Sequence, residues 1–489
     1  MESLWLIPAL LLGGFVFVFG ILRRFNDWYY IGRLGKKQYP LPPGDMGWPY
    51  LGGILTFLKA FRSGDPDSYI HNLVSKYGRT GIYKTFMFGN PSVIVCTPET
   101  CRKVLTDDDR FKLGYPKATT ILTGRRAFHG ISNAEHKRLR RLTTSPINGH
   151  EALSGYIDLI EGIVATTLEE WASMKHPIEL LTELRGVAFK VITNIFISTH
   201  SDSVISKVEN LYSDLNAGLK SQAINLPGFV FHKALKARKK LMKIFQDILD
   251  KKRAMVKKDS SQTESTKDMM DLLLGVKDED GKQLEDEDIV DLLIVFMLAG
   301  HESSAHGALW AVIYMSQNPE VFKKAREEQQ EIMKRRPSTQ KRLSLAEIRQ
   351  MDYLSKVIDE TLRRTSISFA VFREAKEDVN VNGYLIPKGW KVLVWNRGVH
   401  MDPENYSDPK EFNPSRWENN KPRAGGFLPF GLGSRYCPGS DLAKLEITIF
   451  LHHYLLNYNV ERVNPDGPVN YLPVARPVDM CLARVIKVT

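Results

Sequence analysis

The residues most able to do chemistry surround one cysteine near the C-terminus. Cys437 stands in "FLPFGLGSRYCPGSDLAKLE", residues 427–446, among glycines, prolines and arginine. A redox or zinc cysteine would need a CxxC partner, which is absent nearby. A nucleophile would need a neighbouring base, and a buried structural cysteine would not need so many glycines. A thiolate that ligates a metal fits the segment best.

The neighbours of Cys437 favour a flat cofactor. Gly431, Gly433 and Gly439 allow backbone to approach such a group closely. A helix predicted to begin near Gly439 would point its positive end at the sulfur and lower the thiol pKa. Arg435 offers a cation for a carboxylate of the cofactor.

A long central helix is predicted over residues 284–319, "LEDEDIVDLLIVFMLAGHESSAHGALWAVIYMSQNP". Glu302 and Ser303 interrupt its apolar run, and buried polar groups cost stability unless they are satisfied. The pattern predicts a local distortion of a functional helix, and the alternative is an exposed polar face. His301 and His306 are five residues apart, which is not the spacing of a helical metal pair.

Two more helical segments carry paired polar residues. In residues 351–366, Glu360 and Arg363 are three apart and share a face, although an ExxR pair alone is usually a surface ion pair. In residues 135–147, His136 and Arg140 lie one turn apart.

The elements that must position these residues are mostly helices. Residues 151–200 and 205–255 show apolar spacings of three and four. Strand patterns are short, at 91–97 and within 379–395, where Asn382-Gly383 marks a hairpin turn. Hydrophobic content of 43% and charged content of 25% are ordinary for a globular enzyme. Four scattered cysteines exclude a disulfide scaffold and indicate a reducing compartment.

The N-terminal segment is typical of a membrane anchor. Residues 4–22 carry no charge and would span about 28 Å as a helix. Arg23 and Arg24 follow, which places the rest of the chain in the cytosol. A cleaved signal peptide fits less well because no Lys or Arg precedes the apolar run. We therefore predict an anchor at 1–24, a basic, proline-rich hinge at 25–53 and a catalytic domain at 54–489.

The net charge of +11 can be interpreted in several ways. Basic residues gather at 232–243 and 251–258 without the interleaved aromatics that nucleic-acid binding favours. The segments are predicted to contact an anionic membrane surface or an acidic electron donor, and the alternative is a solvated helix face.

Residues 430–439, "FGLGSRYCPG", match the FxxGxRxCxG signature of the cytochrome P-450 superfamily. "AGHES" (299–303), "ETLR" (360–363) and "FNPSRW" (412–417) resemble its other landmarks, in its order. The resemblance implies a mainly α fold with a small β lobe. Two positions depart from the family pattern: Ser303 replaces the usual Thr, and His136 replaces a Trp.

The resemblance also implies roles for individual residues. Cys437 would ligate the iron of haem b, and Glu302 and Ser303 would pass protons to bound oxygen. Residues implied to contact the haem are His136, Arg140, Arg373, Phe430, Arg435, Cys437 and Gly439, and a buried ionic network would join Glu360, Arg363 and Arg416.

Electrons would have to come from a partner, because the chain lacks a nucleotide-binding G-x-G-x-x-G loop after a strand. The resemblance implies an NADPH-dependent flavoprotein reductase, molecular oxygen and the endoplasmic reticulum membrane. The implied pocket is apolar, so a lipophilic substrate is expected. Its residues are Phe296, Ala299, Phe369, Val371 and Leu472.

Within the superfamily, "LPPGDMGWP", "RKVLTDDDRFKLGYPK" and "FREAKEDV" resemble the plant ent-kaurenoic acid oxidases, which oxidise a diterpene acid successively toward gibberellins. The alternative is a triterpenoid oxidase acting on a β-amyrin-type substrate. Lys117, Arg125 and Arg126 are candidate partners for a substrate carboxylate. Two rival classes are a haem-thiolate isomerase or dehydratase that does not use oxygen, and a non-catalytic membrane binding protein. The Glu302-Ser303 pair and the thiolate loop, respectively, argue against them.

Overall fold

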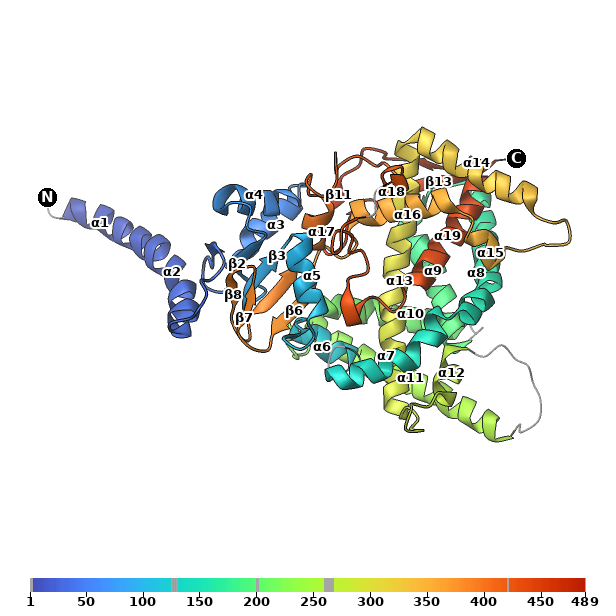
Figure 1. Ribbon diagram of the computed structural model, residues 1–489, viewed down its shortest axis with the longest axis horizontal. Coiled ribbons are helices and arrows are strands. Elements are labelled where there is room, and N and C mark those ends of the chain that lie inside the picture. The colour runs from blue at the N-terminus through green and yellow to red at the C-terminus, as the bar shows by residue number, and fades with distance from the viewer. Residues whose placement is uncertain are drawn as a thin grey trace.

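A helical body and a β-sheet lobe meet at the segment that carries Cys437, residues 427–439, called the cysteine loop below (Figure 1). The computed structural model describes residues 3–124, 126, 128, 131–198, 202–258, 268–419 and 422–488. Most of these residues lie in helices and the strands are short, which confirms the mainly α fold with a small β component.

The helical body is built from long helices, and shorter helices lie both beside the sheet and against the long helices. The long ones are α7 (Asn133–Asn148), α8 (His150–Ser173), α9 (Leu180–Ile197), α10 (Asp202–Leu219), α11 (Val230–Lys258), α13 (Asp286–Gln317), α14 (Pro319–Arg335), α16 (Asp352–Thr365) and α19 (Ser440–Asn457). The short ones are α3 (Ile54–Arg62), α4 (Ser68–Tyr77), α5 (Pro98–Thr106), α6 (Lys117–Thr123), α12 (Met269–Gly275), α15 (Leu345–Ile348), α17 (Asn396–His400) and α18 (Arg416–Asn419).

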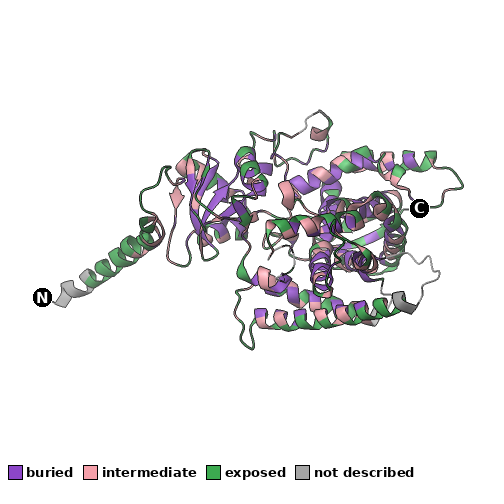
Figure 2. Cartoon of the chain, turned by 60° about the horizontal axis from the view of Figure 1, so that its bottom comes forward, coloured by how far each residue is buried: buried purple, intermediate pink, exposed green. Residues whose placement is uncertain are grey.

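Helix α13 is the central element of the body and packs against α9, α16 and α19. Acidic residues fill its first turn, where the helix dipole favours negative charge, and Asn318-Pro319 ends it. Its side chains are apolar on nearly every face because other helices cover it on every side. Among the described helices it alone has the length and hydropathy of a membrane span, yet 78% of its most apolar stretch is buried in the protein. It is therefore a core helix (Figure 2).

The main sheet has six strands in the order β1-β2-β3-β9-β6-β4. Its strands are β1 (Gly44–Asp45), β2 (Ile82–Met87), β3 (Asn90–Val95), β9 (Lys391–Val394), β6 (Val371–Ala375) and β4 (Phe111–Leu113). Strands β6 and β9 come from the C-terminal half of the chain, so the sheet joins the two halves. Because β6 pairs with β4 and β9, Arg373 is held on a rigid element.

Small antiparallel units complete the β structure. They are β10 (Tyr458–Arg462), β13 (Leu482–Lys487) and β5 (Ile178–Glu179); β11 (Val469–Asn470) and β12 (Arg476–Pro477); and β7 (Val379–Val381) and β8 (Tyr384–Ile386). The turn between β7 and β8 contains Asn382 at φ 53° and Gly383 at φ 83°, the left-handed pair that an Asn-Gly hairpin turn requires.

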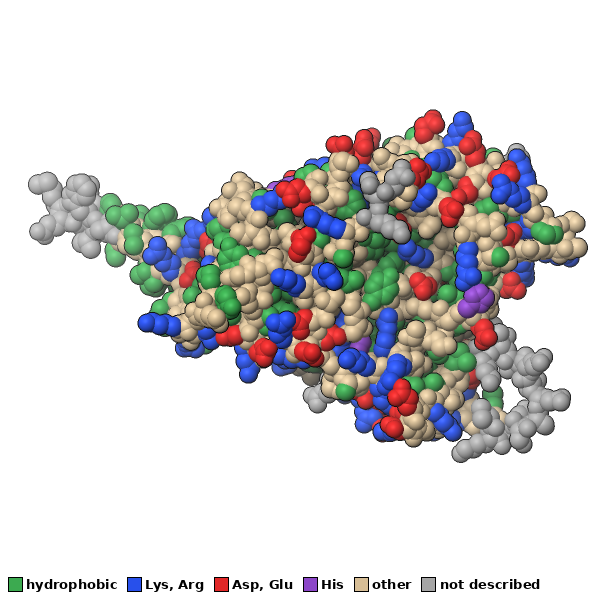
Figure 3. All heavy atoms as spheres, viewed as in Figure 1, with side chains coloured by type: hydrophobic (Ala, Val, Ile, Leu, Met, Phe, Trp, Pro, Cys, Tyr) green, Lys and Arg blue, Asp and Glu red, His purple; other side chains and the backbone are tan. Residues whose placement is uncertain are grey.

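The N-terminal segment extends away from the body as helical turns that include α1 (Ser3–Phe15) and α2 (Arg23–Asn26). The described side chains of α1 are apolar and exposed, with Leu10 and Leu11 each 70% accessible (Figure 3). The Asn26 amide donates to the carbonyl oxygens of Met46, at 3.1 Å, and Trp48, at 2.7 Å. These bonds fix the end of the helix against the proline-rich segment.

Candidate active site

A cavity of about 430 Å³ lies between the cysteine loop and the middle of α13. The loop contributes Phe430, Arg435 and Cys437 to its wall, and α13 contributes Ala299 and Ser303. The backbone N–H of Cys437 donates to the carbonyl of Phe430 at 2.9 Å, which closes the loop on itself. The sequence motifs predicted that these two segments act together, and the fold brings them to one cavity.

Glycine is required at one position of the loop. Gly433 adopts φ +76°, and a Cβ there would lie 2.4 Å from the carbonyl oxygen of Leu105. Any larger residue would push the loop away from α5 and so displace Cys437.

Cys437 is half-buried and is the one cysteine of the chain that lines this cavity. Burial raises the pKa of its thiol, while the backbone N–H of Gly439, at the start of α19, and the charge of Arg140 favour the thiolate. We expected the N-terminus of α19 to lower the pKa of Cys437, but without a bound metal the effect of burial is larger and the pKa is raised. Positive charge from a metal would complete the stabilisation of the thiolate.

Three arginines form a cationic rim beside the cavity. Burial lowers the pKa of Arg435 to about 10, and it also lowers the pKa of the buried Arg373 and the half-buried Arg140. None of the three forms an ion pair with a carboxylate among the described residues. Arg435 instead donates to the amide oxygen of Asn133 at 2.8 Å. Such a rim can bind the carboxylates of an anionic group.

His136 lies in the same cluster and is buried. Burial, followed by the charges of Arg435 and Arg140, lowers its pKa to about 4, so the ring is neutral near pH 7. A neutral imidazole can still donate one hydrogen bond to an anion.

The predicted ionic network is present beneath the cysteine loop. Arg363 donates from Nε and Nη2 to the two carboxylate oxygens of Glu360, each at 2.8 Å, and both residues are 0% exposed. Arg416 Nε donates to Glu360 at 2.9 Å, and the indole of Trp417 donates to it at 3.0 Å. The carboxylate is therefore saturated by donors from two segments far apart in sequence.

Sequence reasoning missed His400, which connects this network to the cysteine loop. Its carbonyl accepts from Arg363 Nη1 at 2.8 Å, and its ring accepts from the backbone N–H of Leu428 at 2.8 Å. No local motif marks His400, because its role depends on contacts with residues 28 and 37 positions away.

Helix α13 is continuous through "AGHES", so the predicted distortion is absent from it. The hydroxyl of Ser303 is satisfied within the helix, because it donates to the carbonyl of Ala299 at 2.9 Å. The hydroxyl therefore has an acceptor although the helix is unbroken.

Ser303 and Glu302 point in different directions. Ser303 lines the cavity, whereas Glu302 is outside its wall and pairs with Arg185 of α9, 3.3 Å from Nε to the carboxylate. Burial raises the pKa of Glu302, but the charges of Arg185 and Lys220 outweigh that effect and hold it below its usual value. Sequence reasoning missed Arg185, which no motif marks.

The substrate-facing residues were predicted in part. Phe296, Ala299 and Val371 line the cavity, together with Ile192 and Ile367.

Phe369 and Leu472 do not line it. The ring of Phe369 packs instead against those of Phe57, Phe61 and Trp395, with centroids 5.1–5.5 Å apart. Leu472 packs against the same apolar cluster. Aromatic packing beside the sheet thus turns Phe369 away from the cavity.

The cations predicted for a substrate carboxylate are absent from the described wall of the cavity. Lys117 is exposed at the start of α6. Arg126 is exposed and pairs with the acidic first turns of α13, including Glu287 at 3.2 Å and Asp288 at 3.5 Å. Arg125 lies outside the described residues. The acidic residues that stabilise the start of α13 thus also form ion pairs with Arg126.

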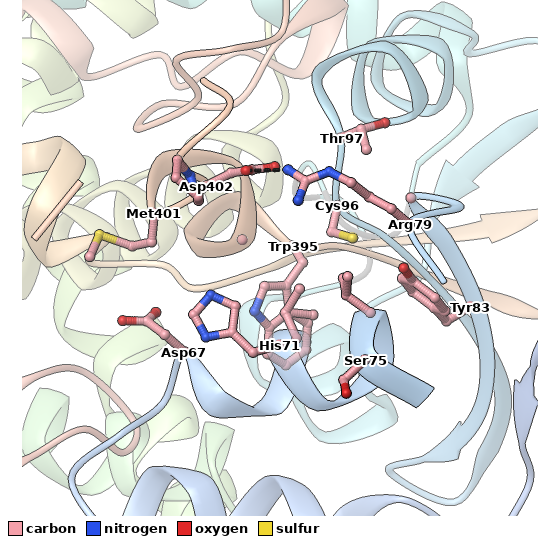
Figure 4. A pocket seen from close by; sticks show the side chains of 15 residues that line it. Asp67, His71, Ser75, Arg79, Tyr83, Cys96, Thr97, Trp395, Met401 and Asp402 are labelled. Atoms are coloured by element: carbon pink, nitrogen blue, oxygen red, sulfur yellow. Dashed lines mark hydrogen bonds and ion pairs between the residues drawn. The ribbon is translucent and has the colours of Figure 1, made fainter. Parts of the chain in front are cut away.

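A second pocket, of about 220 Å³, lies between α4 and the sheet and shares no lining residue with the cysteine cavity. Figure 4 shows Arg79 paired with Asp402 across its rim, with Cys96 below. Burial raises the pKa of Cys96 to about 12, so the thiol stays protonated. Asp67, at the same pocket, is held by Arg397 at 2.7 and 2.9 Å. His71 and Ser75 also line this pocket, but no hydrogen bond joins them among the described residues.

Comparison with known proteins decides the family. Residues 42–474 match the family model for cytochrome P-450. The chain belongs to the cytochrome P-450 family. A retinoic acid bound cyanobacterial cytochrome P-450 superposes with a TM-score of 0.80 at 25% identity, over 92% of this chain and 100% of that one.

Three plant relatives are similar over nearly their whole length. A 7,8-epoxymelianol synthase of Ailanthus altissima is 57% identical over 486 residues, which cover 99% of this chain and 97% of that protein. A beta-amyrin 11-oxidase of Glycyrrhiza uralensis is 56% identical over 491 residues, 100% of both chains. An ent-kaurenoic acid oxidase 2 of Arabidopsis thaliana is 56% identical over 480 residues, 98% of this chain and 97% of that protein.

This cytochrome P-450 is therefore a monooxygenase that binds haem through a cysteine. The cavity fits that group. Its wall contains a lone thiol and a glycine backbone that allows close approach, and the arginines beside it, which have no carboxylate partner among the described residues, match two propionates. Haem, when bound, would supply the oxygen chemistry that no side chain can perform.

Proposed function

We propose that this cytochrome P-450 oxidises a bulky, neutral polycyclic terpenoid. The main support is that the cavity wall around Ser303 is apolar. It is formed there by Ile192, Phe296, Ala299 and Ile367. The basic and acidic side chains in the described wall are Arg373 and Arg435 of the cationic rim, and Glu446, whose pKa burial raises to about 8. An uncharged terpenoid would need no charged partner there. The names of the Glycyrrhiza and Ailanthus relatives support a substrate of this class.

In this proposal, individual residues bind the haem, position the cysteine loop and hold protons. Cys437 would ligate the iron, with Phe430 and Gly439 shaping the loop around it. Arg140, Arg373, Arg435 and His136 would bind the propionates. Ser303 would hold a proton donor in the cavity, with Glu302 behind it, and Glu360, Arg363 and Arg416 would keep the cysteine loop in place.

The second candidate is successive oxidation of ent-kaurenoic acid toward a gibberellin precursor. The Arabidopsis relative of that name is as similar as the β-amyrin oxidase, at 56% identity. This substrate carries a carboxylate, which would need a cation or several donors inside the cavity.

The experiment compares the two substrate classes. Membranes that carry the protein and a plant NADPH-dependent reductase receive ent-kaurenoic acid, its methyl ester and β-amyrin. Oxidation of β-amyrin or the ester, with none of the acid, supports the neutral terpenoid. Conversion of the acid alone, lost in Arg125→Ala, overturns it in favour of the diterpene acid.

The haem ligand is tested separately. Cys437→Ser should abolish the red-shifted carbon monoxide complex of the reduced protein, while Cys481→Ser, at a buried position outside the cavity, should retain it. Retention of that band in Cys437→Ser would exclude Cys437 as the ligand.

The same proposal places the protein at the endoplasmic reticulum membrane, with residues 1–24 as a single anchor, 25–53 as a hinge and 54–489 in the cytosol. The exposed apolar helix and the bonds from Asn26 to the proline-rich segment support this arrangement. The reductase would dock on the cytosolic body. Deletion of residues 1–24 should move the protein from the membrane to the soluble fraction, and unchanged membrane association would contradict the anchor.

A further inference from the structure

An unpaired amide oxygen lies at the wall of the cysteine cavity. It belongs to Asn396, the first residue of α17, which lines this cavity and is 2% exposed. The amide nitrogen, Nδ2, donates to the backbone carbonyl of Ser368 at 3.4 Å. The amide oxygen, Oδ1, is buried and has no hydrogen-bond partner among the described residues. A buried acceptor without a donor costs stability, so its presence in a cavity wall points to a partner that the cavity receives.

The bond to Ser368 determines which side of the amide carries the oxygen. Only the nitrogen can donate to a carbonyl, so Oδ1 occupies the other side of the amide group. The hydroxyl of Ser368, which also lines the cavity, donates to the carbonyl of Ala370 at 2.9 Å. That hydroxyl therefore keeps only its lone pairs for a further partner. The wall at this place offers oxygen acceptors to a ligand.

The backbone on both sides of Asn396 is fixed by hydrogen bonds. The N–H of Trp395 donates to the carbonyl of Val95 at 2.8 Å, and the N–H of Arg397 donates to the carbonyl of Phe369 at 3.2 Å. The amide is thus held in place before any ligand binds, which lowers the entropy cost of binding.

Asn396 lies apart from the cationic rim. In the β6–β9 pair, Arg373 is opposite Val392, four residues before Asn396 along the chain. The Asn396 amide instead contacts the segment of residues 367–371, which contributes Ile367 to the apolar part of the wall. The arginines are therefore placed for the propionates, and the amide is placed for the substrate.

The chemistry of Oδ1 selects the group that it can bind. An alcohol donates a hydrogen bond to such an oxygen, whereas an ionised carboxylate and a hydrocarbon have no proton to donate. A site that binds a hydroxyl group rejects an analogue without it, because the buried acceptor is then left unpaired.

We propose, on the basis of the neutral terpenoid substrate proposed above, that Asn396 determines specificity by binding an alcohol group of that substrate. The O–H of the terpenoid donates to Oδ1, while its rings pack against Ile367 and the rest of the apolar wall. The bond orients the rings in the cavity and so restricts which carbon atom is oxidised. The substrate class is a polycyclic terpenoid that is apolar apart from a hydroxyl group.

Binding of two matched ligands tests this role without turnover. The full-length haem protein is titrated with β-amyrin and with olean-12-ene, the same skeleton without the hydroxyl group, and the shift of the haem absorption band gives each Kd. In the wild type, olean-12-ene should bind at least about tenfold more weakly than β-amyrin. In Asn396→Leu, and in the smaller Asn396→Ala, the two ligands should bind with nearly equal affinity because the acceptor is absent.

Ile367→Val is the matched control, since it trims the apolar wall on the same side of the cavity. It should weaken the binding of both ligands and keep the ratio of their Kd values. The carbon monoxide band should be retained in all three variants, which checks that the haem site is intact.

Two results would overturn the role of Asn396 while the neutral terpenoid function stands. They are equal affinity for the two ligands in the wild type, and a ratio that is unchanged in the Asn396 variants. Binding of ent-kaurenoic acid, with no shift from either β-amyrin or olean-12-ene, would instead refute the proposed function and the inference with it.

Discussion

The ring Nε2 of His400 accepts a hydrogen bond from the backbone N–H of Leu428, with 2.8 Å between the two nitrogens. Because Nε2 accepts, the ring proton lies on Nδ1, which donates to the hydroxyl of Ser366 at 3.0 Å. That hydroxyl donates in turn to the carbonyl of Arg363 at 3.0 Å. One buried, neutral histidine thus joins the ion-paired helix α16 to the segment that leads to Cys437.

His400→Leu should therefore loosen the cysteine loop. The substitution leaves the buried N–H of Leu428 without an acceptor, which costs about 1–3 kcal/mol of unfolding free energy. The fraction of protein that gives the carbon monoxide band should fall with it. Ser366→Ala is the control, because it removes the acceptor of the His400 Nδ1–H but keeps the hydrogen bond from Leu428, so it should lower the fraction of protein that gives the carbon monoxide band less than His400→Leu does. Equal losses of stability and haem in the two variants would contradict this role for His400.

Cys437 could be predicted from the sequence and His400 could not, because only Cys437 lies in a local motif. The cysteine loop, the Glu360–Arg363 pair and the Asn382-Gly383 turn are local patterns, in which a few neighbouring residues determine the geometry. Their positions in the structure agree with the prediction. His400 and Arg185 act through partners distant in sequence, so no spacing within their own segments marks them.

The same limit applies to side-chain direction. Glu302 and Ser303 are neighbours on α13, and consecutive helical residues project about 100° apart. The sequence could not decide which of them faces the cavity, because Arg185 of α9 determines the orientation of Glu302. Phe369 was misplaced for a similar reason, since its direction depends on Trp395 and on Phe57 and Phe61 of α3.

Glu302 and Ser303 should respond differently to substitution. Ser303→Ala removes a hydroxyl from the cavity wall, so product per NADPH should fall while haem and substrate binding remain. Glu302→Gln breaks the partly exposed pair with Arg185, which should cost about 1 kcal/mol or less and change coupling less. The measurements are the ratio of product formed to NADPH consumed, called coupling, and the free energy of unfolding of each variant. A larger coupling loss in Glu302→Gln would show that the acid acts from its position beside Arg185.

Buried histidines should make the protein sensitive to acid. Burial lowers the pKa of His452 and His400 to about 3, and of His306 to about 4, from 6.5. The unfolded chain then binds more protons than the folded one below about pH 6.5, so stability falls as pH decreases. Each such histidine contributes a loss of about 1.4 kcal/mol per pH unit in that range.

His452 gives the sharpest test, because its ring lies outside the cavity wall and contacts the amide oxygen of Gln329 at 2.8 Å. Denaturant unfolding at pH 7 and pH 5.5 should show a smaller acid-induced loss in His452→Gln than in the wild type. His71, which is exposed, supplies the control: His71→Gln should follow the wild type. If His452→Gln loses as much stability as the wild type, the buried ring does not remain neutral.

The ionic network under the cysteine loop should depend most on its acid. Glu360 accepts from Arg363, Arg416, Trp417 and the backbone N–H of Asn413. Glu360→Gln keeps the shape but leaves both arginines without their carboxylate, and an uncompensated buried charge costs about 3–5 kcal/mol. Arg416→Gln leaves the bidentate Arg363–Glu360 pair intact and should cost clearly less. Unfolding free energy and haem content should therefore rank wild type above Arg416→Gln and Arg416→Gln above Glu360→Gln.

Because Arg363 also donates to the carbonyls of His400 and Glu411, its displacement in Glu360→Gln should release the cysteine loop and lower haem content in parallel with stability. A Glu360→Gln protein that retains full haem content would separate the network from the positioning of Cys437 and contradict the role given to it.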